Sequence, residues 1–307
     1  MNATETQVIE HEGLLGIVGN TPLISLRSLH SNHVEIYAKA EWHNPSGSVK
    51  DRPAAAIIRE ALRSGELGNG RTLLDSTSGN MGIAYATLAA SIGVPVHLTL
   101  PANANNARKV MLSSVGAQLT LTDPLEGSDG ARHVASALAA EHPDRFYYAD
   151  QYSNPANWRS HFETTGPEVL RDTEGRLTHF VAGLGSTGTV VGTGRYLREA
   201  APEVEIIAFQ PASPLHGLEG LKNLPSSEVP EIFDPHVPDD TLEVSTEDAY
   251  EMARRLAREE GLIVGPSSAA AAVAALALSK QIDRGVIVTL FADSGLKYLD
   301  LPFWDKA

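Results

Sequence analysis

Short apolar runs alternate with longer amphipathic or alanine-rich segments over most of the chain, from about residue 71 onward. Apolar runs bounded by glycine or proline predict buried strands, and segments with an apolar face predict helices. The predicted strands are 72–74, 94–100, 118–122, 146–149, 178–182, 205–209 and 286–291, and the predicted helices are 82–91, 106–115, 128–141, 190–200, 246–260 and 267–281. Strands that alternate with helices predict an α/β fold with mostly parallel sheets, covered by helices on both faces.

The length of 307 residues exceeds that of a typical single hydrophobic core, so we expect two domains or one large α/β unit. The segment 151–158 is expected to cross between two α/β halves. One long segment, 211–238, is proline-rich and weakly periodic. A connector of this length usually has a function, and we expect an active-site flap, a binding loop or an oligomer contact.

The composition excludes several kinds of site and partner. The formal net charge of −14 disfavours nucleic acid and anionic membranes as partners. The chain has no cysteine, so disulfides and thiolate metal ligands are excluded, and its histidines show no metal-ligand spacing. No apolar run approaches the length of a membrane span and the N-terminus lacks a signal-peptide pattern, so we expect a cytoplasmic protein.

Lys50 lies in a turn-forming run just before a predicted helix. Residues 46–48 (Ser-Gly-Ser) allow a tight turn, and Pro53 suits the first turn of a helix with one apolar face. The positive end of the helix dipole lowers the pKa of such a lysine and favours its neutral amine. Because a neutral amine forms a Schiff base with an aldehyde, Lys50 is a candidate nucleophile, with a solvated surface lysine as the alternative.

Two polar glycine-rich loops each follow a predicted strand and precede a predicted helix. In parallel sheets such loops lie at the carboxyl ends of the strands, where ligands bind, so we expect both at one cleft. The first loop, 76–80 (Ser-Thr-Ser-Gly-Asn), has more hydroxyl and amide groups than one helix cap needs. This surplus favours a site for a substrate carboxylate, with Asn80 free to bond a ring oxygen.

The second loop, 183–188 (Gly-Leu-Gly-Ser-Thr-Gly), matches the G-x-G-x-x-G pattern of dinucleotide sites. A dinucleotide site also needs an acidic residue at the end of the next strand, but the predicted strand 205–209 runs into Gln210. The three hydroxyl side chains within 186–189 and the successive backbone N–H groups favour a terminal phosphate dianion instead.

Two shorter motifs have weaker interpretations. The run 265–268 (Gly-Pro-Ser-Ser) opens the predicted alanine-rich helix, and a helix cap and a ligand site are both compatible with these residue types. The run 293–295 (Asp-Ser-Gly) follows the last predicted strand and is expected to be a turn.

Taken together, these runs resemble the cysteine synthase family, also called O-acetylserine sulfhydrylases, among the fold type II pyridoxal-phosphate enzymes, with the B-type branch the nearest match. The motifs that carry the similarity are 19–23, 39–41, 44–53, 78–82, 151–157, 162–168, 183–188 and 265–268. The resemblance implies a two-domain, tryptophan synthase β-like α/β fold. Residues 1–43 and 156–307 would form a large cofactor-binding domain and residues 44–155 a small mobile domain. A homodimer is also implied.

The resemblance implies roles for individual residues. Lys50 matches the catalytic lysine that forms the Schiff base with pyridoxal 5′-phosphate, and Ser267 matches the serine that faces the pyridine nitrogen. The phosphate loop is matched by Gly185, Ser186, Thr187, Gly188 and Thr189. The groups that receive the substrate carboxylate are matched by Thr77, Ser78, Asn80 and Gln151. Asn80 also matches the residue beside the cofactor ring hydroxyl.

Two positions bear on the substrate. Met81 stands where threonine is usual in the family, so one carboxylate-binding hydroxyl is missing. Lys222 lies near a point where a basic residue, in a related branch, favours O-phosphoserine over O-acetylserine. That branch takes sulfur from a small thiocarboxylated carrier protein, which is therefore a candidate partner.

The implied reaction is β-replacement, which converts O-acetyl-L-serine or O-phospho-L-serine and sulfide to L-cysteine. Within the same fold, the alternatives are a cystathionine β-synthase and a serine/threonine dehydratase. A non-enzymatic alternative is a catalytically silent paralogue that binds serine acetyltransferase as a regulatory partner. A dinucleotide-dependent oxidoreductase is the most distant alternative.

Overall fold

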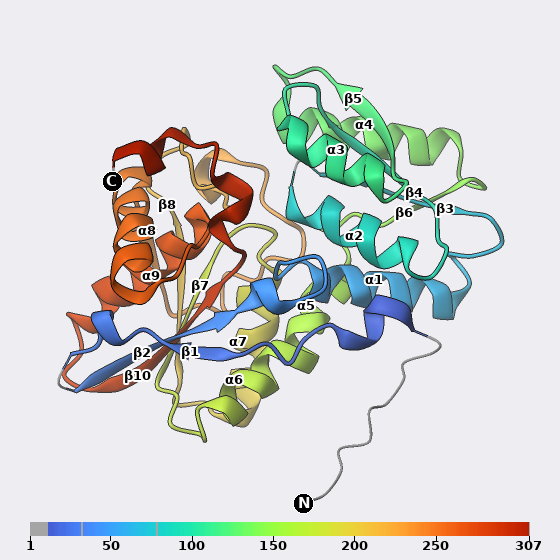
Figure 1. The fold of residues 1–307 in the computed structure, drawn as a ribbon. Coiled ribbons are helices and arrows are strands. Elements are labelled where there is room, and N and C mark those ends of the chain that lie inside the picture. The colour runs from blue at the N-terminus through green and yellow to red at the C-terminus, as the bar shows by residue number, and fades with distance from the viewer. Residues whose placement is uncertain (1–11, 32, 78, 307) are drawn as a thin grey trace, which may run out of the picture.

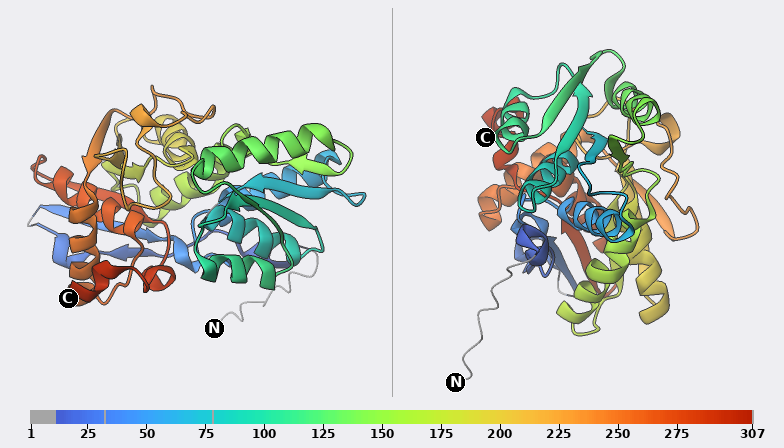
Figure 2. Two further views of the ribbon diagram at one scale, coloured as in Figure 1. Left: turned by 90° about the horizontal axis from the view of Figure 1, so that it is seen from above. Right: turned by 90° about the vertical axis from the view of Figure 1, so that its right-hand side faces the viewer.

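The computed structural model describes residues 12–31, 33–77 and 79–306 of the chain. These residues form two β-sheets, each with helices packed against both faces (Figure 1). We call the six-stranded sheet with its helices the large lobe and the four-stranded sheet with its helices the small lobe. The two lobes lie side by side in the left view of Figure 2.

The sheet of the large lobe has the strand order β1-β2-β10-β7-β8-β9. Neighbouring strands are parallel except for β1 and β2, which are antiparallel. The strands are β1 (Leu23–Ser25), β2 (Val34–Ala40), β7 (His179–Gly183), β8 (Glu205–Pro211), β9 (Asp240–Val244) and β10 (Gly285–Phe291).

The sheet of the small lobe is parallel throughout, in the order β5-β4-β3-β6. Its strands are β3 (Thr72–Ser76), β4 (Val96–Pro101), β5 (Gln118–Thr122) and β6 (Phe146–Tyr148). The mostly parallel α/β architecture predicted from the alternation of apolar runs and helices is confirmed.

Nine α-helices connect and cover the strands in the described part of the chain: α1 (Asp51–Ser64), α2 (Asn80–Ala90), α3 (Asn106–Ser114), α4 (Gly127–Glu141), α5 (Pro155–Ser160), α6 (Gly166–Asp172), α7 (Gly188–Ala200), α8 (Thr246–Glu260) and α9 (Pro266–Ser279). A π-helix spans His161–Thr165. Short 3-10 helices occupy Gly13–Ile17, Arg27–Leu29, Glu41–His43, Leu224–Ser226, Gly295–Tyr298 and Pro302–Lys306. Helices α1 and α5 pack against each other where the lobes meet (Figure 1).

The strands of the large lobe are apolar on both faces because helices cover both. On β10, Ile287 and Phe291 pack in a cluster with α8 and α9, whereas Val288 and Leu290 pack in a second cluster with α7. In the small lobe, Leu73 of β3 faces a cluster that includes α1 and α2. Burial on both faces explains why these strands are continuous apolar runs in the sequence.

Among the described strands and α-helices, five were not predicted from the sequence: β1, β2, β9, α5 and α6. Strand β1 has three residues, and β9 is an edge strand with exposed acidic positions, so neither has an apolar run. Helices α5 and α6 are short and are separated by the π-helix, which breaks the periodicity of 3.6 residues. The segment 211–238 has little regular structure, as predicted.

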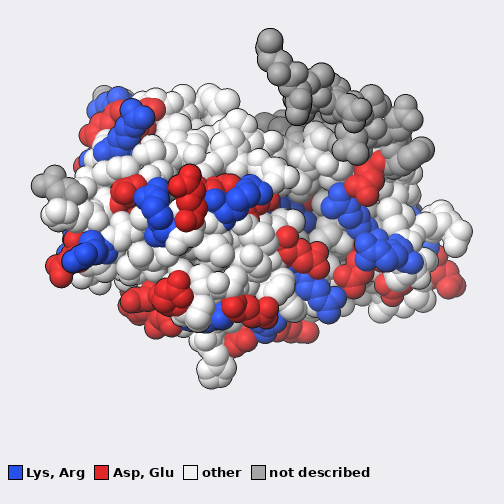
Figure 3. Space-filling model, turned by 90° about the horizontal axis from the view of Figure 1, so that it is seen from below, with Lys and Arg blue, Asp and Glu red and all other residues white. Residues whose placement is uncertain are grey.

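On the face shown in Figure 3, lysine and arginine side chains lie beside aspartate and glutamate, without a large patch of one sign. None of the helices within 12–31, 33–77 and 79–306 has the length and apolar character needed to cross a membrane.

A buried network of charged side chains ties the start of α1 to the large lobe. The guanidinium of Arg52 donates to both carboxylate oxygens of Glu41, at 2.8 and 2.9 Å, and to both of Glu168, at 2.8 Å each. Lys39 adds a second cation 2.8 Å from Glu168. Burial alone would raise the pKa of Glu168, but its hydrogen bonds and charge interactions with Arg52 and Lys39 lower it to about 2.

We predict that Arg52→Met lowers the free energy of unfolding by about 3–5 kcal/mol, because it leaves two buried carboxylates without their shared cation. Denaturant unfolding of the purified variant measures this loss. Glu60→Gln is the matched control, since the exposed Arg159–Glu60 pair is 3.6 Å long and should contribute less than about 1 kcal/mol. Equal, small effects of the two substitutions would show that the buried network does not stabilise the fold.

Candidate active site

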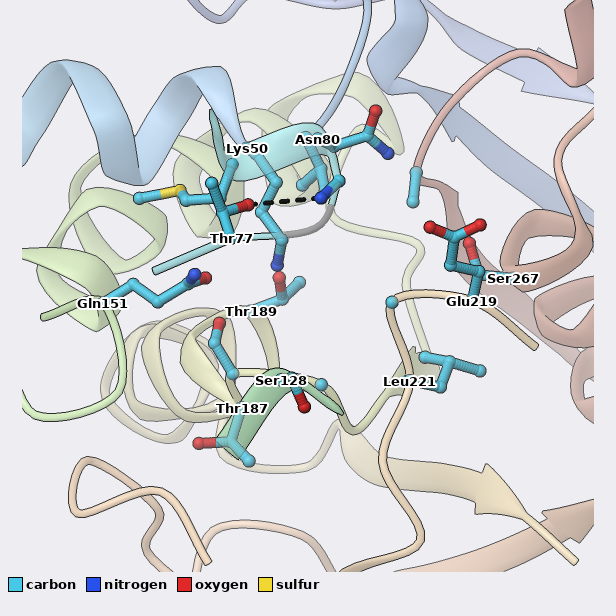
Figure 4. A pocket seen from close by; sticks show the side chains of 18 of the residues that line it. Lys50, Thr77, Asn80, Ser128, Gln151, Thr187, Thr189, Glu219, Leu221 and Ser267 are labelled. Carbon is cyan, nitrogen blue, oxygen red and sulfur yellow. Dashed lines mark hydrogen bonds between the residues drawn. The ribbon is translucent and has the colours of Figure 1, made fainter. Parts of the chain in front are cut away.

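A cavity opens where the carboxyl ends of strands from both sheets meet. Its walls include Lys50, the loop after β3 and the loop after β7. Figure 4 shows the side chains of Lys50, Thr77, Gln151 and Thr189 directed into the same space. The sequence predicted that the two glycine-rich loops share one cleft, and the structure brings them together in this cavity.

Lys50 occupies the N-cap position of α1, and its side chain makes no capping hydrogen bond. The preceding turn contains Gly47 at a φ of 80°, a conformation that favours glycine, and Asp51 accepts hydrogen bonds from the backbone N–H and the hydroxyl of Ser46. Burial lowers the pKa of Lys50 from 10.5 to about 8. The pKa shift has the predicted direction, but its main cause is burial rather than the helix dipole.

The loop after β7 has a hydroxyl that lacks a protein partner. Thr187 adopts a left-handed backbone conformation with a φ of 70°, and its buried Oγ1 has no hydrogen-bond partner among the described residues. A Cβ at Gly188 would overlap Asn157 Oδ1, and one at Gly185 would overlap the carbonyl of Gly220. A buried, unsatisfied hydroxyl at the start of α7, with glycines on both sides, fits the phosphate of pyridoxal phosphate.

The loop after β3 combines a helix cap with a cavity wall. The hydroxyl oxygen of Thr77 accepts from the backbone N–H of Gly79 at 3.2 Å and of Gly82 at 3.0 Å. Its hydrogen is therefore left to donate into the cavity, as a carboxylate ligand requires. Ser78, predicted to bind the same carboxylate, lies outside the described residues.

Asn80 differs from the prediction, because its side chain is not free. Its Nδ2 donates to Asp293 at 2.7 Å, and its Oδ1 accepts from Lys297 at 2.8 Å. In Figure 4 the Asn80 amide points away from the amine of Lys50. The Asn80 amide, which the sequence predicted to be free to bond a ring oxygen, is thus held by two residues more than 200 positions away in the sequence.

Residues 293–298 support the site, although the sequence predicted only a turn at 293–295. Asp293 is buried, and its Oδ2 accepts from Tyr298 at 2.8 Å as well as from Asn80. Lys297 donates to the carbonyls of Ser46 at 3.3 Å and Gly47 at 3.2 Å, so it also holds the turn before Lys50. Lys297 and Tyr298, which follow Gly295, were the sequence signal for this support, because a turn needs neither residue.

Ser267 lines the cavity at the start of α9 (Figure 4). The sequence was compatible with either a helix cap or a ligand site at this position. The next residue, Ser268, is fully buried and donates its hydroxyl to the carbonyl of Asp293 at 3.1 Å. The two serines therefore differ: Ser267 faces the cavity, whereas Ser268 connects α9 to the segment after β10.

The residues predicted to contact substrate occupy different positions. Gln151 and Met81 line the cavity, and Met81 also belongs to the apolar core of the small lobe. Lys222 is not among the lining residues; its Nζ lies 4.9 Å from the ring centre of Tyr152, which does line the cavity. The described structure brings Lys222 to the wall of the site but not into it.

The dinucleotide alternative finds no support in the described residues. Strand β8 ends at Gln210 and Pro211, and its acidic residue, Glu205, lies at the opposite end. No group of three or more histidine, aspartate or glutamate side chains in the described ranges is arranged to hold a metal ion. The donors around the cavity match a phosphate and a carboxylate instead.

Comparisons with known proteins agree with this geometry. A family model described as "Pyridoxal-phosphate dependent enzyme" matches residues 14–293. A cysteine synthase of Aquifex aeolicus is 48% identical over 304 residues, which cover 96% of this chain and 93% of that protein. A cysteine synthase B of Pseudomonas aeruginosa is 38% identical over 298 residues, covering 97% of this chain and 99% of that one.

The fold is also similar to a solved structure of this kind. The crystal structure of a cysteine synthase from Entamoeba histolytica has a TM-score of 0.92 and 29% identity, covering 99% of this chain and 93% of that chain. The predicted fold type II and the predicted cofactor, pyridoxal phosphate, are confirmed. The chain belongs to the cysteine synthase family of pyridoxal-phosphate dependent enzymes.

Proposed function

We propose that this enzyme replaces the leaving group on Cβ of an O-activated L-serine by sulfide, giving L-cysteine. The observation that carries the proposal is the meeting, in one cavity, of a lysine with a pKa of about 8, an unsatisfied hydroxyl in a glycine loop and a hydroxyl-rich second loop. Together these groups match an aldehyde, a phosphate and a substrate carboxylate.

The residues that would hold the cofactor surround the cavity. Lys50 would bind it covalently, and Ser186, Thr187 and Thr189 would hold its phosphate between Gly185 and Gly188. Asn80 and Ser267 would lie beside its ring. When bound, pyridoxal phosphate supplies an electron sink for the pair left on the substrate Cα after deprotonation.

The chain itself moves the proton and orients the substrate. Lys50 Nζ accepts the Cα proton and later returns it, which requires an amine that is neutral for part of the time at working pH. Thr77, Ser78 and Gln151 would hold the substrate carboxylate, with Met81 supplying an apolar wall in place of a hydroxyl. Ser267 presents a neutral hydroxyl, rather than a carboxylate, to the cofactor ring.

We further propose that residues 44–155 form a small domain that closes over the cavity on the remainder of the chain. All four strands of the small lobe come from this range, although Leu15 of the N-terminal segment also packs in its core. Ion pairs bridge the lobes, and one of them joins Arg132 to Glu228 at 2.9 Å. Closure would exclude water from the reacting atoms.

We propose the partners and the cellular location of this enzyme from its family resemblance. They are a homodimer in the cytoplasm, with serine acetyltransferase or a small sulfur-carrier protein as a binding partner. The proposed leaving group is acetate or phosphate.

The reaction is tested by incubating purified protein with pyridoxal phosphate, sulfide and either O-acetylserine or O-phosphoserine, and measuring cysteine. We predict that Lys50→Ala lowers the rate by at least about 100-fold, because the base is lost, and that borohydride reduction no longer attaches the cofactor. Lys280→Ala, at an exposed lysine after α9, is the matched control and should retain full activity. Cystathionine formed preferentially from homocysteine, pyruvate as the main product, or no turnover at all would each contradict the proposal.

The pKa of Lys50 gives a pH prediction. A pKa near 8 leaves about a tenth of the amine neutral at pH 7, whereas an unshifted lysine would be neutral in less than about 0.1% of molecules. The rate of cofactor uptake by the apoenzyme should therefore rise with pH and become level above about pH 8. The rate at which the cofactor reacts with a small lysine amide is measured in the same buffers. It gives the part of the pH dependence that comes from titration of the cofactor itself. An uptake rate that still rises steeply at pH 9.5 would rule out the lowered pKa.

Lys222 gives a test of the leaving group. We predict that Lys222→Ala lowers kcat/KM for O-phosphoserine by about tenfold and leaves that for O-acetylserine unchanged, because only the first substrate carries a dianion for the ammonium to attract. Lys222→Arg should keep most of the phosphoserine activity. Equal losses with both substrates would assign Lys222 to packing against Tyr152 rather than to substrate selection.

A further inference from the structure

His161 is buried behind the loop that follows β7, between two threonine hydroxyls. Its Nδ1 lies 2.9 Å from Thr165 Oγ1, and its Nε2 lies 3.3 Å from Thr189 Oγ1. Thr189 lines the cavity, whereas His161 does not. The histidine is thus in a second layer, in contact with a hydroxyl that reaches the cofactor space.

Local backbone structure brings the histidine to this position. His161 is the first residue of the π-helix, a conformation that is rare and is often found next to functional sites. The π-helix packs closely on α7 because Gly192 has no side chain: a Cβ there would overlap the Trp158 carbonyl and lie 2.7 Å from the Cβ of His161. The π-helix and the close packing at Gly192 together bring the His161 imidazole into contact with Thr189.

The surroundings of His161 favour the neutral form of its imidazole. Burial, together with the positive charges of Arg52 and Lys50, lowers the pKa of His161 well below its usual value. A neutral ring carries one N–H, so one nitrogen donates and the other accepts. The position of this hydrogen, on Nδ1 or on Nε2, decides whether the ring donates to Thr165 or to Thr189.

The two tautomers have different consequences for the cavity. If Nδ1 carries the hydrogen, it donates to Thr165, and the Thr189 hydroxyl must donate to Nε2, which leaves only oxygen lone pairs facing the cavity. If Nε2 carries it, Thr165 donates to Nδ1, Nε2 donates to Thr189, and the Thr189 hydrogen is free. A phosphate dianion accepts hydrogen bonds and cannot donate them, so it requires the second arrangement.

We propose that His161 is a positioning residue for the cofactor phosphate: as the Nε2–H tautomer, it donates to Thr189 Oγ1 and so directs the Thr189 hydroxyl hydrogen at the phosphate. This inference rests on the proposed function, because it assumes that the loop holds a phosphate. It assigns to His161 a role in binding, without contact with the reacting atoms.

The tautomer is measured directly by ¹⁵N NMR of the histidine ring in wild-type protein saturated with pyridoxal phosphate. We expect a neutral ring with the hydrogen on Nε2. A ring with the hydrogen on Nδ1, or a ring that carries both hydrogens, would overturn the inference even if the enzyme is fully active.

Affinity gives an independent test with 4′-deoxypyridoxine 5′-phosphate, which carries the phosphate but has no aldehyde to react with Lys50. We expect His161→Phe to bind this compound about tenfold more weakly than wild type, as for loss of one oriented hydrogen bond. His161→Gln, whose amide can donate from a similar position, should recover most of the affinity. His179→Phe is the matched control: it removes another buried histidine that bonds a threonine, at 2.8 Å, but that threonine, Thr178, does not line the cavity.

The outcomes separate this inference from the proposed function. Failure of the wild-type protein to bind either pyridoxal phosphate or the analogue would contradict the proposed function itself. Normal binding by wild type, with His161→Phe unchanged or with His179→Phe equally impaired, would leave the function standing and reject the role of His161. Should His161→Phe not fold, the wild-type ring tautomer still decides.

Discussion

The bidentate contacts of Arg52 with Glu41 and Glu168 fix the beginning of α1, and the site depends on that anchor. Lys50 precedes Arg52 by two residues, so the network that holds one also sets the direction of the other. Arg52 is buried and Lys50 is half-buried at the cavity, and their pKa values move in opposite directions. Carboxylates raise the pKa of Arg52, whereas Lys50 has no ion pair with any described carboxylate and its pKa falls.

The run 164–168 supports the site without lining the cavity. Thr164 accepts from Arg52 at 2.9 Å, Thr165 contacts His161, and Glu168 accepts from both Arg52 and Lys39. Gly166 leaves room for Tyr196, which a Cβ would overlap. The motif therefore acts as a support, which connects the anchor of α1 on one side with the glycine loop after β7 on the other.

Local sequence predicted most of the fold because the elements are long and their ends are marked. Helix α8 has the predicted bounds, since Ser245 caps its start and Gly261 adopts the left-handed conformation after its end. Strand β9 lacks such signals, and it pairs with β8 only because the chain returns to that sheet edge after the irregular segment 211–238. Each glycine loop lies at the carboxyl end of a parallel strand, as the sequence predicted. Because β3 and β7 belong to different sheets, the meeting of the two loops depends on how the two lobes pack.

The sequence by itself determined which residue types stand in the turns at the strand ends: the lysine after a tight turn, the hydroxyls and the glycines. Only the tertiary structure decided which partners those side chains acquire. Asn80 is taken up by Asp293 and Lys297, 213 and 217 residues away, and Thr189 meets His161, 28 residues away. Backbone preferences act between near neighbours in the chain, whereas hydrogen-bond partners and the loss of water around an amine depend on how distant segments pack.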